Sequence, residues 1–293
     1  MTKAAEFRSG KGHRNENFPV ASRLIARRHR GIIRAFYEFV RTADDIADHA
    51  TLAPAEKLAL LDRLEASLVG TSDADPEGVA LRARLAERGL ASRHAQDLLI
   101  AFRMDVNKQR YVNWDELIRY CSYSAMPVGR FVLDVHGESR ATWQANDALC
   151  AALQIINHLQ DCADDYRNLD RVYIPLDALA AEGESVEALA APAASPALRR
   201  CLVALVERTE ALLRDAHPLP DLVKDRRLSL EISVIETLAQ KLLQILRARD
   251  PLIEDVHLGK AAFAGIGMAG IAHGFLRRLM RRRHETSPRH QDA

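Results

Sequence analysis

Apolar residues recur every three or four positions through most of the chain, and this spacing predicts a series of amphipathic helices. Alternating apolar and polar runs rich in β-branched residues, which indicate half-buried strands, are nearly absent. The periodic segments occupy residues 19–48, 54–69, 77–88, 92–110, 113–136, 146–167, 197–216 and 220–249, and a last region follows residue 256. The sequence therefore predicts an all-α protein.

Several residues predict where these helices begin or bend. Pro19 can open the first helix because a helix's first amide has no partner. Ser92 and Asn113 are suitable N-caps, and Asn113 has Glu116 three residues on, as in a capping box. Pro127 lies inside an apolar helical run, where its ring removes one amide hydrogen bond. We predict a kink there.

A polar stripe crosses the first helix. At about 100° per residue, Tyr37, Arg41, Asp44 and Asp48 fall within roughly 60° of one another. Apolar residues flank this stripe, so the carboxylates are expected to face a cleft or the protein interior.

A second stripe lies in the segment 146–167, for which Asn146 or Asp147 is the predicted cap. It contains Asn157, Asp161 and Asp164, with Asp165 one turn beyond Asp161. Like charges four residues apart destabilise a helix, so a cation is expected between them. Carboxylate oxygens without histidine or cysteine are typical ligands of Mg²⁺.

Two other interpretations of the acidic stripes are open. The carboxylates can simply decorate solvated helix surfaces. A di-iron bundle also uses carboxylates, but it requires two Glu-x-x-His pairs, and the sequence offers only Glu254 with His257. The repeated Asp-x-x-x-Asp spacing in two flanked helices favours the magnesium site.

Composition narrows the possible partners and location. The 293 residues carry 41 lysines and arginines against 40 acidic residues, so no overall field attracts nucleic acid. The four cysteines show neither metal spacing nor a disulfide framework, which favours a reducing compartment. The N-terminus lacks the apolar segment of a signal peptide. We expect a cytoplasmic protein.

We expect one domain spanning residues 1–293, with a polar leader at 1–15 and a basic tail at 277–293. The region before this tail contains a glycine-interrupted apolar run of about a dozen residues, which is too short to span a bilayer. It predicts either a last core helix or a segment that contacts anionic lipid at the inner membrane surface. Contact with a partner enzyme is a further interpretation of this segment.

Three motifs carry a family resemblance. The segment YEFVRTADDIAD resembles the first aspartate-rich motif of the squalene and phytoene synthase family, and NHLQDCADDYRNLDRVYIP resembles the second. The segment YCSYSAMPVG is similar to the stretch that lines the family's reaction cavity. This resemblance covers roughly residues 14–280. It implies an isoprenoid synthase fold, a single domain with a central cavity lined by helices.

The resemblance also implies roles for individual residues. Metal ligands are implied at Asp44, Asp48, Asp161 and Asp165, with Mg²⁺ holding the diphosphate of a prenyl substrate. Catalytic roles are implied at Tyr37, Arg41 and Tyr123, and substrate-binding roles at Asn17, Arg30, Asn157 and Arg171. Around Tyr123 the family's usual Ala-Gly before Val-Gly is replaced by Met126-Pro127. This departure affects the predicted cavity shape and the product.

Within the family, ENFPVAS and RTADDIAD most resemble the hopanoid-pathway branch, the hydroxysqualene synthases. That branch implies conversion of presqualene diphosphate and water to hydroxysqualene and diphosphate, without NADPH. The alternatives are a squalene, presqualene diphosphate or phytoene synthase that condenses prenyl diphosphates, and a non-catalytic assembly factor with the same fold. An assembly factor has no need of the four aspartates, so their presence argues against it.

Overall fold

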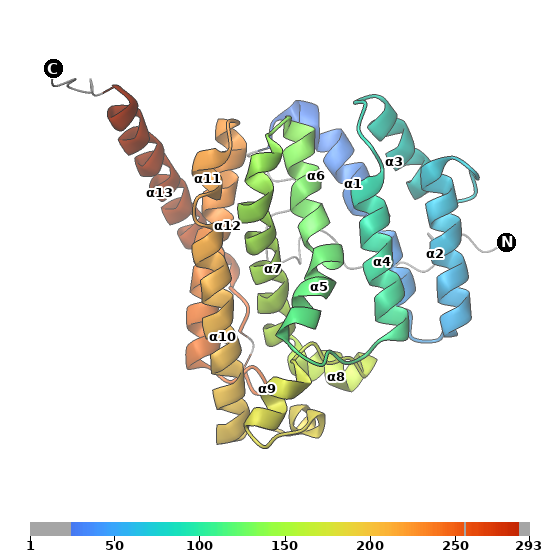
Figure 1. Ribbon diagram of the computed structural model, residues 1–293, viewed down its shortest axis with the longest axis vertical. Helices are drawn as coiled ribbons and strands as arrows, with labels where there is room; N and C mark the ends of the chain where they lie inside the picture. Colours follow the sequence, from blue (N-terminus) through green and yellow to red (C-terminus); the bar gives the residue numbers. More distant parts are fainter. Residues whose placement is uncertain (1–24, 255, 287–293) are drawn as a thin grey trace.

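The computed structural model describes residues 25–254 and 256–286 and is helical throughout (Figure 1). Within these ranges no β-strand occurs, and Arg110 and Val172 form an isolated bridge. The prediction of an all-α protein is confirmed. The α-helices are α1 (Arg27–Ala47), α2 (Pro54–Val69), α3 (Pro76–Ala86), α4 (Arg93–Asn107), α5 (Trp114–Ser124), α6 (Met126–His136), α7 (Trp143–Gln160), α8 (Cys162–Leu169), α9 (Leu176–Ala181), α10 (Pro196–Ala216), α11 (Leu219–Leu222), α12 (Arg226–Ala248) and α13 (Lys260–Thr286), with short 3₁₀ turns η2 (Arg140–Thr142) and η3 (Val186–Ala190).

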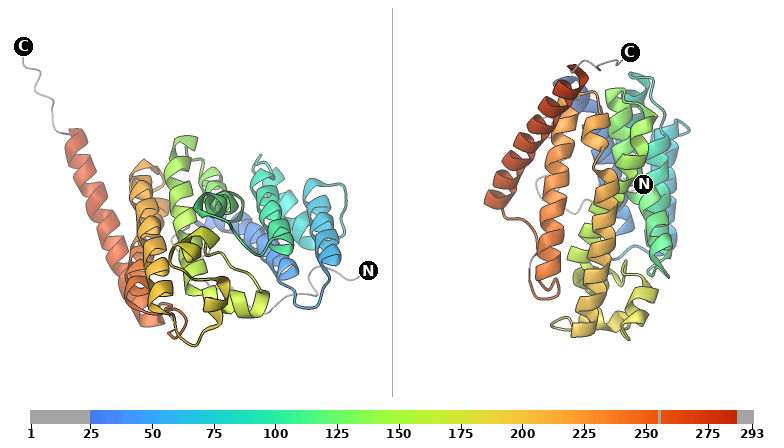
Figure 2. Two further views of the ribbon diagram at one scale, coloured as in Figure 1. Left: turned by 60° about the horizontal axis from the view of Figure 1, so that its bottom comes forward. Right: turned by 60° about the vertical axis from the view of Figure 1, so that its left-hand side comes forward.

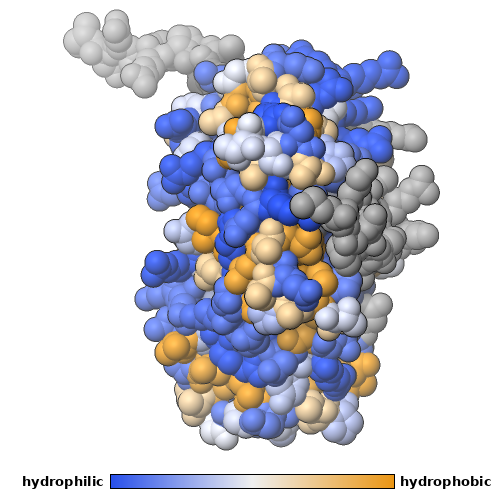
Figure 3. Space-filling model, turned by 90° about the vertical axis from the view of Figure 1, so that its right-hand side faces the viewer, coloured by the Kyte–Doolittle hydropathy of each residue, from blue (hydrophilic) through white to orange (hydrophobic). Residues whose placement is uncertain are grey.

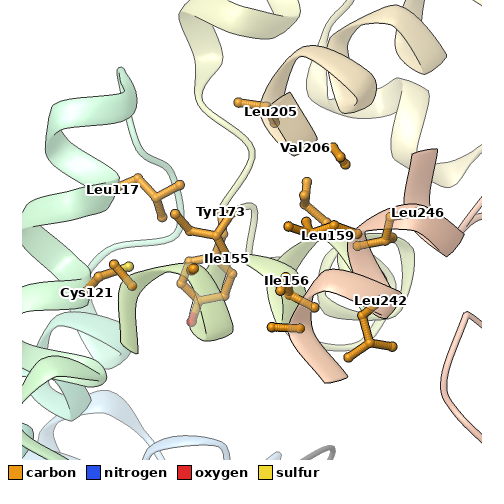
Figure 4. Packing of buried hydrophobic residues seen from close by; sticks show 14 of the residues in the cluster. Leu117, Cys121, Ile155, Ile156, Leu159, Tyr173, Leu205, Val206, Leu242 and Leu246 are labelled. Carbon is orange, nitrogen blue, oxygen red and sulfur yellow. The ribbon is translucent and has the colours of Figure 1, made fainter. Parts of the chain in front are cut away.

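The helices surround two hydrophobic cores. One core contains apolar residues of the four helices α1, α2, α3 and α4, together with Phe131 and Val135 of α6. The other joins α5, α7, α10 and α12, and its centre is formed by apolar residues of α7, including Ile155, Ile156 and Leu159 (Figure 4). Helix α6 contributes to both cores, so it connects the two halves of the molecule.

Helix boundaries differ from the prediction at three places. Helix α1 begins at Arg27, later than the predicted start at Pro19, which lies outside the described residues. The expected kink at Pro127 is a complete break at Ala125, and Pro127 lies in the first turn of α6. Val223 to Asp225 interrupt the helix predicted over 220–249. At the two breaks, a local backbone conformation that hydrophobic periodicity does not report ends the helix.

The predicted caps have different outcomes. The side chain of Asn113 accepts a hydrogen bond from the Glu116 amide at 3.0 Å, as expected. Helix α4 begins directly after Ser92, although the Ser92 side chain makes no capping bond. Helix α7 begins at Trp143, so neither predicted cap residue, Asn146 nor Asp147, is at its start.

The glycine-interrupted region forms a long helix that packs along α12 (Figures 1 and 2). A β-carbon at Gly270 would lie 2.8 Å from the Val234 Cα, so glycine permits this close approach. Helix α13 continues to Thr286, so residues 277–286 of the predicted tail are helical. Arg277 is 10% exposed and pairs with Asp221 and Glu236. Its charge therefore belongs to an ion-pair network within the fold.

The described surface is mixed in character. The side that carries α2 and α3 is mainly hydrophilic, with separate hydrophobic areas between the charged ones (Figure 3). No helix within the described ranges has both the length and the apolarity needed to cross a bilayer. All four cysteines are free thiols, as their spacing predicted.

Candidate functional site

The first acidic motif lies at the C-terminal end of α1. Arg41 forms ion pairs with Asp44 at 3.0 Å and with Asp45 at 3.1 Å, and Asp45 is buried. Asp48 is the C-cap of the helix, and its amide donates to the Asp44 carbonyl. The side chains of Asp44 and Asp48 are 36% and 37% exposed. The two carboxylates predicted as metal ligands are therefore accessible, and Asp45 is held inside the fold.

The second acidic motif lies at a helix break that the sequence did not predict. Asp161 ends α7 and precedes α8, so the expected continuous helix over 146–167 is wrong at this residue. The Asp165 amide still donates to the Asp161 carbonyl at 2.8 Å, which keeps both residues in one turn. Asp161 is 44% exposed and has the His257 ring nitrogen at 3.5 Å. The break separates α8 from α7 and leaves the carboxylates accessible.

The two motifs share one electrostatic environment. Asp44 is half-buried, and its partial desolvation, with the Asp48 and Asp45 charges, raises its pKa to about 7, against the effect of Arg41. Burial and Asp161 raise the pKa of Asp165 to about 7, and Asp48 adds to this effect across the site. The Arg171 amide donates to the Asp165 carbonyl at 3.1 Å and its guanidinium donates to Asp48 at 2.9 Å, so one residue contacts both motifs and they face one another. Their negative charge exceeds what the neighbouring arginines neutralise.

Arg171 joins the first motif to a buried polar network. Its side chain is 8% exposed, donates to Asp48 at 2.9 Å, and lies 3.9 Å from the Asp105 carboxylate. Asp105 on α4 also accepts from the hydroxyls of Tyr120 and Tyr173, each at 2.9 Å. Burial raises the pKa of Asp105 to about 6, although Arg171 and both hydroxyls oppose the rise. The network holds Arg171, and through it Asp48, in one orientation.

Sequence reasoning missed Asp105 and the two tyrosines. Asp105 occupies the position that follows Leu98 and Phe102 on the apolar face of α4, and this placement predicts burial. A carboxyl group on an apolar helix face requires partners, so the signal was present in the sequence. The identity of those partners depended on the packing of α4 against α5 and the segment after α8.

An apolar cavity lies between the helices that carry the acidic motifs, and its lining on α1 ends at Val40, one turn before Asp44. Tyr37, one turn before Arg41, lines it together with Phe36 and Phe131, whose rings stack at 3.8 Å. Helices α1, α6, α7 and α12 supply most of its walls, which confirms the prediction of a cavity lined by helices. Glu231 is a buried polar group in this lining. The cavity has the apolar character needed to hold a hydrocarbon chain.

The other predicted site residues are dispersed. Arg30 donates to the Ile25 carbonyl at 2.9 Å and precedes Asp44 by about 21 Å along α1, so the structure does not bring it to the aspartates. Tyr123 packs against the core around α7, and Asn157 lies one turn before Asp161. Asn17 lies outside the described residues.

The donor chemistry of the facing motifs fits Mg²⁺. All four predicted ligands offer carboxylate oxygens, which are hard donors, and the raised pKa values of Asp44 and Asp165 indicate negative charge that a cation would stabilise. Within the described residues these carboxylates do not converge on one point closely enough to form a group of three. Substrate phosphate oxygens and water commonly complete the coordination of Mg²⁺, so ligands on opposite walls suffice.

Comparison with solved structures defines the class. The chain is similar to a squalene synthase from Alicyclobacillus acidocaldarius, with a TM-score of 0.71 and 30% identity over 84% of this chain and 92% of that one. A dehydrosqualene synthase at 20% identity shares the fold, with a TM-score of 0.78 over 92% and 95% of the two chains. The protein therefore has the all-α isoprenoid synthase fold.

The sequence profile described as squalene/phytoene synthase matches residues 12–261, and the chain belongs to this family. A hydroxysqualene synthase from Rhodopseudomonas palustris is 58% identical over 95% of both chains. Another, from Sinorhizobium fredii, is 56% identical over 96% of this chain and 97% of its own length. The predicted resemblance to the family is confirmed.

Proposed function

We propose that this chain is a hydroxysqualene synthase, which converts presqualene diphosphate and water to hydroxysqualene and diphosphate. The observation that carries the proposal is the 58% identity to a hydroxysqualene synthase across 95% of both chains. The facing aspartate motifs beside an apolar cavity support it, because such a substrate has an anionic head and a long hydrocarbon body.

In this proposal, Asp44, Asp48, Asp161 and Asp165 hold Mg²⁺, with Asn157 as a neighbouring ligand or orienting group. Bound there, Mg²⁺ supplies charge neutralisation for the departing diphosphate. The class of reaction is a carbon–oxygen lyase acting on a prenyl diphosphate.

The chain's own residues orient these ligands and separate the two ends of the substrate. Arg41 bridges Asp44 and Asp45, so it fixes the first motif and places positive charge near the leaving group. Arg171 orients Asp48 through its buried ion pair, a positioning role in place of the direct substrate contact implied by the sequence. Tyr37 lines the cavity two turns before Asp44 on the same helix, where it can contact the hydrocarbon chain of the substrate.

A second candidate is a condensing enzyme of the same family. The solved relative that is 30% identical is a squalene synthase, and phytoene synthases from mycobacteria are 34% identical over 56% of this chain. A squalene synthase would require NADPH, and a presqualene diphosphate or phytoene synthase would consume simple prenyl diphosphates.

The test is incubation of the purified protein with presqualene diphosphate and Mg²⁺, with and without NADPH, followed by mass spectrometry of the neutral lipid. We expect the same alcohol in both reactions. Squalene formed only with NADPH, or turnover of farnesyl diphosphate alone, would move the chain to the second candidate. Asp161→Asn is the control for a contaminating activity. Failure of this chain to bind Mg²⁺ together with a diphosphate would favour a non-catalytic assembly factor.

For cellular location we propose the cytoplasm, with peripheral contact at the inner membrane surface through α13. Met268, Phe275 and Leu276 are exposed on this helix, with 69%, 61% and 58% of their surfaces accessible. Their side chains support contact with a membrane or a partner enzyme, either of which would receive the apolar product. A partner among the enzymes of squalene synthesis is compatible with the same surface.

A further inference from the structure

A second group of metal-ligand residues lies far from the aspartates. His29 in the first turn of α1, His136 in the last turn of α6 and Asp225 at the N-cap of α12 each offer a ligand atom, all within 4.8 Å of one another. The two imidazole rings have centroids 4.2 Å apart with planes inclined by 39°. Since His29 precedes Asp44 by fifteen residues, the group lies about 22 Å along α1 from the first acidic motif.

His136 has the hydrogen-bonding pattern of a metal ligand. Its Nδ1 donates to the Val132 carbonyl at 2.8 Å, which fixes the proton on that nitrogen. Its Nε2 is buried and has no hydrogen-bond partner among the described residues. A backbone carbonyl that orients one ring nitrogen while the other is bare is the common arrangement of histidines at metal centres.

His29 is the most buried member of the group. The residue is 5% exposed, and its Nδ1 has no hydrogen-bond partner within the described part of the chain. Burial and the neighbouring His136 lower the pKa of His29 to about 4, so the ring is neutral near pH 7. Because Nε2 accepts a hydrogen bond from Arg28, the neutral ring carries its proton on Nδ1. A metal would bind Nε2 in place of Arg28, or Nδ1 after the proton has moved to Nε2, and in both cases Arg28 must withdraw.

Asp225 supplies the charge. Its Oδ1 caps α12 by accepting from the amides of Arg227 and Leu228, which leaves Oδ2 for another partner. The Glu138 carboxylate accepts a hydrogen bond from the Asp225 amide at 2.7 Å, which anchors the cap residue. Oδ2 lies 3.8 Å from the guanidinium of Arg28, which also donates to His29 Nε2 at 2.9 Å. Arg28 thus competes with a cation for two of the three groups.

We propose that His29, His136 and Asp225 form a binding site for a divalent transition metal of the zinc class. Two imidazoles and one carboxylate are a usual donor set for Zn²⁺, and a water would complete the tetrahedron. In a tetrahedral zinc site the ligand atoms lie about 3.4 Å from one another, so the three atoms, now within 4.8 Å, must approach by up to about 1.4 Å through side-chain rotation. The Arg28 side chain is 70% exposed and can rotate into solvent when the metal binds.

The site would join three walls of the apolar cavity. Ile33, Val132 and Leu228 line the cavity, and each lies three or four residues from one member of the group. A metal held by α1, α6 and α12 would cross-link these helices at the end of the cavity remote from the aspartates. Because the ligands come from distant parts of the sequence, binding would favour the folded state.

The test is titration of the full-length, chelator-treated protein with Zn²⁺ and Co²⁺ in excess Mg²⁺, which occupies the acidic motifs. We expect one equivalent bound, a visible Co²⁺ spectrum of a low-symmetry site, and a melting temperature raised by about 5 °C at a hundredfold excess over Kd. His136→Gln should weaken binding by more than about 100-fold, beyond the effect of losing an outer-sphere partner.

Three further variants separate this site from other histidines. Asp225→Asn retains a good N-cap but loses the charge, so it should also lose the metal. His94→Gln alters a buried histidine that pairs with Asp134 at 2.9 Å, and it should bind as the parent does. Arg28→Gln removes the competing cation and should tighten binding about fivefold. Equal binding in the parent, His136→Gln and Asp225→Asn proteins, or no bound equivalent in the parent, would overturn the proposal.

Discussion

Replacing Arg171 with methionine tests the buried network behind the first acidic motif. The change removes the cation beside Asp105, which is 6% exposed, and the partner of Asp48. Removing one member of a buried ion pair costs about 3–5 kcal/mol. Protonation limits the part of this cost that falls on Asp105, because a carboxyl whose pKa is already about 6 in the parent can be neutralised at pH 7 for about 1.4 kcal/mol.

This reasoning also predicts the pH dependence. In the variant, the pKa of Asp105 rises further above its unfolded value, so the folded state binds the extra proton and loses stability as pH increases. Since the pKa of Asp105 is already about 6 in the parent, the loss relative to the parent should change little between pH 5 and pH 6 and then grow by about 1.4 kcal/mol per pH unit, so that it is about 1.4 kcal/mol larger at pH 7 than at pH 5. Urea unfolding followed by circular dichroism measures both values.

Two controls sharpen the experiment. Arg110→Met breaks an ion pair with Asp170, whose side chain is 77% exposed, and should cost under about 1 kcal/mol. The double variant Arg171→Met with Asp105→Asn should recover most of the lost stability, because no unpaired charge remains in the buried network and Asp48, at 37% exposure, is solvated. A loss under 1 kcal/mol in Arg171→Met at pH 7, or a loss equal at both pH values, would refute the argument.

Three other predictions follow from the site, the helix packing and the surface. Asp44→Asn or Asp161→Asn should abolish turnover of presqualene diphosphate and leave the circular dichroism spectrum unchanged, since removal of like charge relieves repulsion; normal activity in both would exclude a metal-binding role. Gly129→Ala should lower the free energy of unfolding by about 1–3 kcal/mol, because its β-carbon would lie 2.1 Å from a side-chain oxygen of α7. The control Gly31→Ala, with open space at its β-position, should raise that energy by up to about 1 kcal/mol, and an equal loss in both would contradict the packing argument. The protein should sediment weakly with anionic vesicles at low salt, and Phe275→Asp should reduce this association; no sedimentation would leave α13 as a packing helix alone.

The helices and the family could be predicted from the sequence because the residues that indicate them lie close together along the chain. The helix periods over 54–69 and 197–216 appear in the structure within one residue of their predicted bounds. The break at Pro127 follows from a missing amide, which acts on the same turn. The two aspartate motifs were recognised because their spacing repeats within single turns. Such features need no knowledge of what packs against them.

The break at Asp161 marks the limit of this reasoning. The spacing of Asn157, Asp161 and Asp165 suits a continuous helix, and the backbone retains one hydrogen bond of that helix across the break. No proline or glycine stands there, so the sequence offers no local reason for α7 to end. The separate direction of α8 depends on its contacts with η3 and on the network around Arg171.

The sequence by itself determined the all-α class, most helix positions and the two carboxylate pairs, since each depends on intervals of three or four residues. Only the tertiary structure decided which of those carboxylates face one another, that Arg171 is buried against Asp48 and Asp105, and that His29 and His136 meet Asp225. These contacts join residues far apart along the chain. Helical periodicity specifies a face within one helix, whereas the packing of many side chains determines which faces meet.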